Sequence, residues 1–355
     1  MNQSSVRKEA IDLGKLSAAS GRITDLWSFV QLVAPSHEVK QTADLAARFC
    51  LQSASADVQL AGIDYLGMNF YEKELQLLID KNKQSLHARN KSYAQLYELI
   101  IQYQIYKLPG DEYERQTSRV CADYPETKAL VLIGKIYQHF YCSDYYILGH
   151  YLDDLQETIL HIKDYMLQRM MTVRLEKLLF QYHWKRNELI IARKHSNNIL
   201  DHTYLPGQRA MQHYKMGLTF LFDDKIASFS HLAEGSKLAK QYEITFLAPL
   251  LERQVLPIVA AHFDLPHRFV TDDPYALAYI EFQLGQTSSA RKRYPVRKPE
   301  KQTAFYKYFY GLIYQKKDFL VDSYHQFIRR HKDFYFSRLP MYAIQDMDNR
   351  RPSPR

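Results

Sequence analysis

The fold is decided by a stretch near the C-terminal end of the chain, residues 304–330, which reads AFYKYFYGLIYQKKDFLVDSYHQFIRR. It repeats apolar residues every three or four positions, the period of an amphipathic helix. It also contains four features at fixed spacing: a large residue before a glycine (Tyr310-Gly311), an aromatic residue (Tyr314), a small residue (Ser323) and a second aromatic residue (Phe327). We expect Gly311 and Ser323 to let two helices approach closely, while Tyr314 and Phe327 fill the space between neighbouring hairpins.

This spacing is that of the tetratricopeptide repeat, a helical hairpin that cannot bury its apolar face alone. The first half of the pattern recurs at Tyr214, Gly217 and Phe220, and a looser version at Phe282, Gly285 and Ala290. Such hairpins stack with a small rotation at each step, which leaves a concave inner surface. We therefore predict an all-α protein, a right-handed superhelical array of tetratricopeptide-like helical hairpins whose concave surface holds a partner.

Helical periodicity continues through most of the chain, and short breakers separate the segments. The segments lie at residues 6–19, 23–33, 37–51, 55–67, 70–84, 88–106, 125–141, 144–162, 166–184, 187–202, 207–222 and 225–242. We expect a turn at Leu108-Pro109-Gly110-Asp111, because Pro and Gly follow each other there. The short joints suit antiparallel hairpins.

The composition is that of an ordered globular protein, with 46% hydrophobic and 24% charged residues. Cys50, Cys121 and Cys142 match no zinc spacing and come without a secretory leader, so we expect free thiols in the cytoplasm of the host cell. The most apolar stretch, residues 244–263, carries Glu252 and Arg253 in its middle. It therefore predicts a buried pair of helices and not a membrane span.

The net charge of +8 is concentrated at the C-terminal end. Residues 291–355 carry 16 Lys and Arg against 6 Asp and Glu, while the rest of the chain is slightly acidic. A basic face attracts nucleic acid, an acidic protein or an anionic peptide, but a solvated helix surface has the same composition. Aromatics interleave with cations from Phe305 to Tyr310, as in nucleic-acid binders, although the repeat itself also explains them.

Few residues suggest chemistry. Asp153, Asp154, Glu157 and His161 have helical spacing that suits a metal site, but also the outer face of a charged helix. His262 and His267 flank Asp264 around a Leu-Pro break, which a loop with capping residues explains better than catalysis. The chain has no glycine-rich phosphate loop and no nucleophile elbow. We therefore expect neither an enzyme nor a metal or cofactor.

The chain also resembles a known family from Gly21 to about Asn349. The matching positions are Phe29, Cys50-Leu51, Arg174, Ser196, Gly217, Leu221-Phe222, Gln241, Tyr279-Ile280-Glu281-Phe282, Asp333 and Arg338-Leu339-Pro340. On these residues the chain resembles the arbitrium receptors (AimR) of temperate Bacillus phages. The resemblance implies an intracellular tetratricopeptide-type quorum-sensing receptor that binds a short phage-encoded peptide and regulates transcription in the lysis-lysogeny decision.

Both ends depart from the family. Its members place a helix-turn-helix before the segment that matches Gly21, whereas residues 1–20 resemble only a remnant of one, with Ala10, Leu13-Gly14 and Ser17. The family ends in an apolar dimerisation helix, whereas residues 350–355 form a polar tail. We therefore divide the chain into the remnant 1–20, the repeat domain 21–349 and the tail 350–355. DNA binding and homodimerisation both stay open.

The resemblance also implies a peptide groove, in which the family uses asparagine side chains. The corresponding positions are Gln181, Lys185 and Leu218, and the family's acidic groove residues fall at Asp273 and Asp333. Gln181 keeps an amide, Lys185 introduces a cation and Leu218 is apolar, so a different peptide from the family's usual one is expected. Asp333 is also placed to cap the helix that begins beside it.

Two functions follow from the sequence. The first is an arbitrium-type receptor for a short signalling peptide that regulates transcription. The second is a derived helical-repeat scaffold that no longer binds DNA and instead binds a regulator protein.

Overall fold

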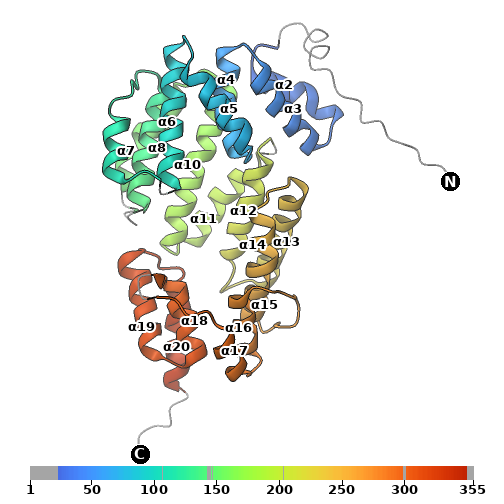
Figure 1. Ribbon diagram of the computed structural model, residues 1–355, viewed down its shortest axis with the longest axis vertical. Helices are drawn as coiled ribbons and strands as arrows, with labels where there is room; N and C mark the ends of the chain where they lie inside the picture. Colours follow the sequence, from blue (N-terminus) through green and yellow to red (C-terminus); the bar gives the residue numbers. More distant parts are fainter. Residues whose placement is uncertain are drawn as a thin grey trace, which may run out of the picture.

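A computed structural model of the protein describes residues 23–105, 107–141, 145, 147–202, 204–298 and 301–349. Every regular element within these ranges is a helix, which confirms the predicted all-α class. Figure 1 shows the helices as a curved array that begins at α2 and turns back on itself at α18–α20. The expected segment 6–19, the remnant 1–20, Cys142 and the tail 350–355 lie outside the described residues.

The first half of the array contains short helices that pack in neighbouring pairs. Its elements are α2 (Leu26–Val33), the 3₁₀-helix η1 (Ala34–Ser36), α3 (Val39–Gln52), α4 (Ala56–Met68), α5 (Glu72–Lys83), α6 (Ala88–Gln104), α7 (Gly110–Thr117), α8 (Pro125–Tyr141) and α9 (Ile147–Leu160). The expected turn at residues 108–111 is shorter than predicted, because α7 begins at Gly110. Its N-cap is Pro109, whose extended backbone leads directly into the helix.

The middle of the array is built on α10 (Tyr165–Lys185), a 21-residue helix that contacts α2, α4, α8, α9 and α11. Three further helices follow it: α11 (Leu189–Leu200), α12 (Pro206–Leu218) and α13 (Lys225–Gln241). Two large clusters of buried apolar residues divide the molecule, one from Leu26 to Leu205 and one from Phe180 to Ala343. Because α10 supplies residues to both clusters, it joins the two halves.

The second half contains the remaining helices. They are α14 (Leu247–Leu250), the π-helix η2 (Leu251–Val255), α15 (Leu256–His262), α16 (Pro274–Gln283), α17 (Thr287–Arg293), α18 (Ala304–Tyr314), α19 (Lys317–His325), the π-helix η4 (Gln326–Arg330) and α20 (Arg338–Asn349). The pair of helices expected at 244–263 is wrong. Residues 247–262 form one continuous helical run, because the backbone stays helical through η2 and Pro257 occupies a first-turn position of α15.

The hairpin α18–α19 has the predicted close approach. A methyl group on Gly311 of α18 would lie 2.8 Å from side-chain carbons of Leu320 on α19. Ser323 is fully buried, and its hydroxyl donates to the Ala304 carbonyl at 2.8 Å. The hydroxyl of Tyr314 donates to the Arg291 carbonyl at 2.8 Å, which ties α18 to the preceding hairpin. The residue pattern therefore has the physical role expected of it.

The hairpin α12–α13 repeats this arrangement. A methyl group on Gly217 would lie 2.7 Å from Leu232, and Ser228 donates to the Gly217 carbonyl at 2.9 Å. Gly285 differs, because it lies in the turn after α16 with φ +76°, where no side chain crowds it. Its role is conformational freedom in the left-handed region and not a close helix approach.

Gly311→Ala is expected to lower the free energy of unfolding by about 1–3 kcal/mol, because the added methyl group overpacks the interface with Leu320. Gly149→Ala is the matched control. Gly149 is an exposed position of α9 with no atom within 4 Å of the added methyl group. Alanine there should raise stability by about 0.5–1 kcal/mol. Urea unfolding followed by circular dichroism measures both changes, and equal effects would refute the close approach.

Candidate functional site

The segment 333–336, between η4 and α20, contacts α10 and α12, and Figure 1 draws α18–α20 in red below the lower end of α10 and α11. The Phe334 amide donates to the Lys185 carbonyl at 2.8 Å, and the Tyr335 hydroxyl donates to the Leu218 carbonyl at 2.7 Å. The Lys185 ammonium also forms an ion pair with Asp333. These contacts join residues far apart in the chain and attach the segment before α20 to α10 and α12.

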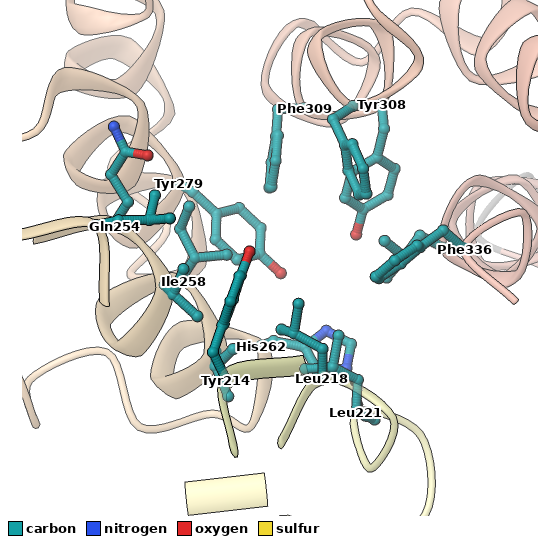
Figure 2. A pocket seen from close by; sticks show the side chains of 15 residues that line it. Tyr214, Leu218, Leu221, Gln254, Ile258, His262, Tyr279, Tyr308, Phe309 and Phe336 are labelled. Carbon is teal, nitrogen blue, oxygen red and sulfur yellow. Dashed lines mark hydrogen bonds between the residues drawn. The ribbon is translucent and has the colours of Figure 1, made fainter. Parts of the chain in front are cut away.

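An apolar cavity of about 280 Å³ lies between α12, the helical run 247–262, α16 and the C-terminal helices. Figure 2 shows it between side chains of α12, the run α14–α15, α16, α18 and α20. Its walls are aromatic and aliphatic: Tyr214, Leu218, Leu221, Leu250, Gln254, Val255, Ile258, Val259, His262, Tyr279, Phe305, Tyr308, Phe309, Phe336 and Leu339. We name this space the aromatic cavity. Concave sites with few polar groups are typical of ligand pockets.

Three tyrosine hydroxyls supply polar groups in the aromatic cavity. In Figure 2 the hydroxyls of Tyr214, Tyr279 and Tyr308 point toward its centre from three different helices. Burial raises the pKa of Tyr279 to about 12 and the pKa of Tyr308 well above its usual range. Burial also raises the pKa of Tyr214, so all three are neutral near pH 7. The Tyr279 hydroxyl already accepts from Gln283 Nε2 at 2.8 Å and shares a hydrogen bond with Tyr308.

His262 forms part of the floor of the cavity. Its Nε2 lies 3.0 Å from the Leu221 carbonyl oxygen, and burial lowers the pKa of the ring. A neutral ring that donates through Nε2 therefore fits this contact. The interpretation of His262 as a loop residue is wrong, because α15 continues to this position and carries the ring against Leu221.

A second pocket of about 250 Å³ lies beside the first, between α8, α10 and α12. It is lined by Tyr137, Phe140, Lys177, Leu178, Gln181 and Lys215. We name it the lysine pocket. Lys215 and Leu218 are one helical turn apart on α12, so this helix contributes to both pockets.

The two lysines of this pocket have lowered pKa values. Burial, and to a smaller extent the charge of Lys185, lowers the pKa of Lys215 to about 8. Burial and the charges of Lys215 and Arg174 lower the pKa of Lys177 well below its usual range, and the nearby Asp64 opposes this shift. Both shifts have the direction expected of ammonium groups that have lost water and face like charges.

A family model described as AimR transcriptional regulator-like matches residues 42–346. The chain belongs to this family. The family is one of transcriptional regulators and not of enzymes. A search of curated proteins found no match.

Two solved structures of an AimR protein share the fold. The structure of phAimR-Ligand superposes with a TM-score of 0.71 at 16% identity, covering 96% of this chain and 98% of that chain. The structure of SeMet-phAimR has a TM-score of 0.70 at 15% identity, covering 95% and 90%. The array of helical hairpins is therefore the AimR architecture over nearly the whole chain.

Four of the five predicted groove residues line one of the two pockets or lie next to the wall of the aromatic cavity. Gln181 lines the lysine pocket, and Leu218 lines the aromatic cavity. Lys185 and Asp333 form an ion pair, and the Lys185 ammonium lies 5.6 Å from the ring of Phe336, a residue of the cavity wall. A direct role of these residues in ligand binding stays a prediction.

Asp273 lies behind the cavity wall. Its Oδ1 accepts the backbone amides of Tyr275 and Ala276 at 3.1 and 2.9 Å, so it caps α16. Its Oδ2 accepts from Gln254 Nε2 at 2.9 Å, and Gln254 lines the cavity. In this structure Asp273 therefore acts on the cavity through Gln254.

Asp333 caps the turn 334–337 that leads into α20. Its Oδ1 accepts the Phe336 amide at 3.0 Å, and its Oδ2 is the partner of Lys185. The carboxylate is 97% buried by these contacts, since only 3% of the side chain is exposed. Its two oxygens thus have separate structural partners.

Sequence reasoning missed Lys177, Lys215, Tyr279 and Tyr308 as site residues. A lysine on a polar helical position is typical of a solvated face, so its spacing contains no signal for a pocket. Tyr279 belongs to a stretch that matched the family, which was a usable signal. The tyrosines were assigned to packing between repeats, and only the folding back of α18–α20 places them around a cavity.

The acidic residues of α9 lie away from both pockets. Asp153, Asp154 and Glu157 are exposed, and the His161 ring contacts the Glu157 carbonyl at 2.7 Å. Within the described ranges, no group of three or more His, Cys, Asp or Glu side chains is placed to hold a metal ion. In the same part of the chain, no helix combines the length and apolar character needed to cross a bilayer.

Proposed function

We propose that this AimR-like regulator is an intracellular receptor for a short signalling peptide and controls transcription in a phage lysis-lysogeny decision. The observation that carries the proposal is the aromatic cavity, which is apolar, contains three tyrosine hydroxyls and is lined on one side by the C-terminal helices. By its name, phAimR-Ligand was solved with a ligand, and it has the same fold.

The cavity is well placed to couple binding to a change of shape. Its wall combines α12 with α18 and α20, and these elements meet through the hydrogen bond of Tyr335 to Leu218 and the ion pair of Lys185 with Asp333. We call the arrangement with these contacts formed closed, and the arrangement without them open. A ligand that contacts both sides of the cavity stabilises the closed arrangement only as far as it binds that arrangement more tightly than the open one. Peptide binding then shifts the population of the C-terminal helices.

Calorimetry with the short peptide encoded beside the gene tests the receptor function. We expect binding by the native chain and at least tenfold weaker binding by Leu218→Trp, because the indole fills the aromatic cavity. Leu86→Trp is the control, since Leu86 is fully exposed and far from the cavity in the chain. The absence of both heat and a thermal shift with the native chain would contradict the proposal.

The transcriptional part of the proposal needs a separate measurement. Electrophoretic mobility of the neighbouring promoter should show salt-dependent retention, which the peptide changes. Retention that the peptide leaves unchanged would separate DNA binding from the receptor function. If no retention occurs and a specific host or phage protein is recovered with the chain, the scaffold function replaces direct regulation of transcription.

A further inference from the structure

A basic surface lies at the end of α17 and on the segment that follows it. Residues 291–298 read RKRYPVRK, which contains five cations and no acidic residue. Figure 1 shows α16 and α17 near the lower end of the array. The five cations are all exposed, and we name them the basic surface: Arg291, Lys292, Arg293, Arg297 and Lys298.

Most of the charge of the basic surface has no carboxylate partner within the described residues. Arg293 is the exception, since its Nε donates to Glu281 Oε1 at 2.9 Å. The other two arginines have neutral partners. In the same part of the chain, the two lysines form no side-chain hydrogen bond or ion pair. The surface therefore presents positive charge that no contacting carboxylate balances.

Neutral groups of α16 and α18 hold two guanidinium groups of the basic surface in place. Arg291 Nε donates to the Ile313 carbonyl at 3.0 Å. Arg297 Nε donates to the Tyr275 hydroxyl, and the Arg297 amide donates to the Tyr306 hydroxyl at 3.1 Å. Because only Nε is used in each case, both Nη atoms of each arginine keep their N–H donors for an external acceptor.

The same contacts fix the length of the basic surface. The Tyr314 hydroxyl donates to the Arg291 carbonyl at 2.8 Å, and Tyr306 bonds the amide of Arg297. Tyr306 and Tyr314 are about two turns of α18 apart, which is about 12 Å along the helix axis. One strand of duplex DNA carries a phosphate at intervals of about 3.4 Å along its axis. The surface is therefore long enough to face several consecutive phosphates.

The aromatic residues beside the basic surface are used in packing. Phe305, Tyr308 and Phe309 line the aromatic cavity, and the ring of Tyr310 stacks on that of Tyr314 at 4.2 Å. The interleaved aromatics of residues 305–310, which the sequence shares with nucleic-acid binders, therefore have partners in the protein. Cations and not stacking platforms remain for a nucleic acid, which favours contacts with phosphates over contacts with unpaired bases.

The composition of the basic surface favours a nucleic acid over a protein. Protein–protein interfaces have an apolar core and are depleted in lysine. Protein–DNA interfaces are much more positively charged. The large apolar side chain exposed within 291–298 is that of Val296, at 81%. One exposed valine among five cations matches the second kind of interface.

We infer that the basic surface binds the phosphate backbone of duplex DNA without sequence preference. The inference rests on the transcriptional part of the proposed function and adds a DNA contact at the C-terminal end of the chain. Charge-assisted hydrogen bonds from the free Nη atoms and the two lysines position the duplex.

Fluorescence anisotropy of a labelled duplex of random sequence, about two helical turns long, tests the inference. The double variant Lys292→Gln with Lys298→Gln should bind at least tenfold more weakly than the native chain at about 0.1 M salt. The slope of the logarithm of affinity against the logarithm of salt concentration should fall by about 2, because each phosphate contact contributes about 0.9. Thermal melting should stay unchanged, since neither lysine side chain has a contact within the described residues.

The double variant Lys128→Gln with Lys225→Gln is the matched control. These lysines are exposed on α8 and α13, and their replacement lowers the net charge by the same amount. We expect native affinity and a native slope. Equal losses in the two double variants would show that only net charge matters, and would overturn the inference.

Two further outcomes would also overturn it. The first is failure of the random duplex to bind the native chain at about 50 mM salt. The second is displacement of the duplex by poly-glutamate as effectively as by the same charge of unlabelled DNA, which would assign the surface to acidic proteins.

The proposed function is judged by different readouts. Promoter retention that the peptide alters, without binding of the random duplex, would refute the inference and keep the proposed function. Binding of the random duplex through Lys292 and Lys298, with promoter retention that the peptide leaves unchanged, would keep the inference and refute peptide control of transcription.

Discussion

Asp64→Ala is expected to lower the free energy of unfolding by about 3–5 kcal/mol. Asp64 lies on α4 and is completely buried, and its Oδ1 accepts a hydrogen bond from Arg174 Nε of α10 at 2.7 Å. The same guanidinium donates to the Tyr97 hydroxyl at 2.6 Å, and the Tyr93 hydroxyl bonds Asp64. Removal of the carboxylate leaves a buried positive charge without a partner, at the point where α10 joins the first half of the array.

Urea unfolding followed by circular dichroism measures this change. Glu234→Ala is the control, because Glu234 pairs with Lys237 at 3.2 Å on an exposed face and should contribute at most about 1 kcal/mol. The double variant Asp64→Leu with Arg174→Met should be more stable than Asp64→Ala, since it leaves no unpaired charge. A loss below 1 kcal/mol in Asp64→Ala would show that the ion pair does not hold α10 to α4.

Asp333→Ala should lower the free energy of unfolding by about 2–4 kcal/mol. The substitution removes the partner of Lys185, whose side chain is only 17% exposed, and it also removes the hydrogen bond to the Phe336 amide. Loss of such a cap alone costs about 1 kcal/mol. We expect the loss to be largest in α18–α20, because the Asp333 contacts attach these helices to α10.

Hydrogen exchange separates local loosening from global unfolding. In Asp333→Ala the amides of α18–α20 should exchange faster, while those of α4 and α6 keep their native rates. Asp333→Asn keeps an oxygen for the cap and should have a smaller effect. Asp322→Ala is the control in the same region, since Asp322 is 64% exposed in its pair with Lys307. Uniformly faster exchange over the whole chain would contradict a local role.

The sequence predicted the helical hairpins well because their signals are local. Gly311 and Ser323 have the close contacts expected from their size, and Gly217 has the same role in α12–α13. The incorrect prediction of the fold also concerns a local feature. The stretch 244–263 was predicted as a pair of helices because Glu252 and Arg253 lie in its middle, but the backbone stays helical through the π-helical turn at 251–255.

The candidate site was predicted less completely. The family resemblance identified Gln181 and Leu218, and the structure places both in pockets. It also identified Lys185 and Asp333 as groove positions, but 148 residues separate them and nothing local indicates that they bind each other. Arg174 was a matching position without an assigned role, and the structure shows it buried against Asp64.

Residue size, helical period and the spacing of small and aromatic side chains were therefore enough to determine an all-α array of stacked hairpins. Each of these signals acts within one hairpin or between neighbours, so a single sequence contains them in full. The aromatic cavity depends instead on the C-terminal part of the chain, which is attached to α10 and α12 through Phe334, Tyr335 and the Lys185–Asp333 pair. Only this long-range attachment decides that the tyrosines surround a cavity, and only the packing of α8, α10 and α12 places Lys177 and Lys215 in one pocket. Both properties arise between segments that no local pattern connects.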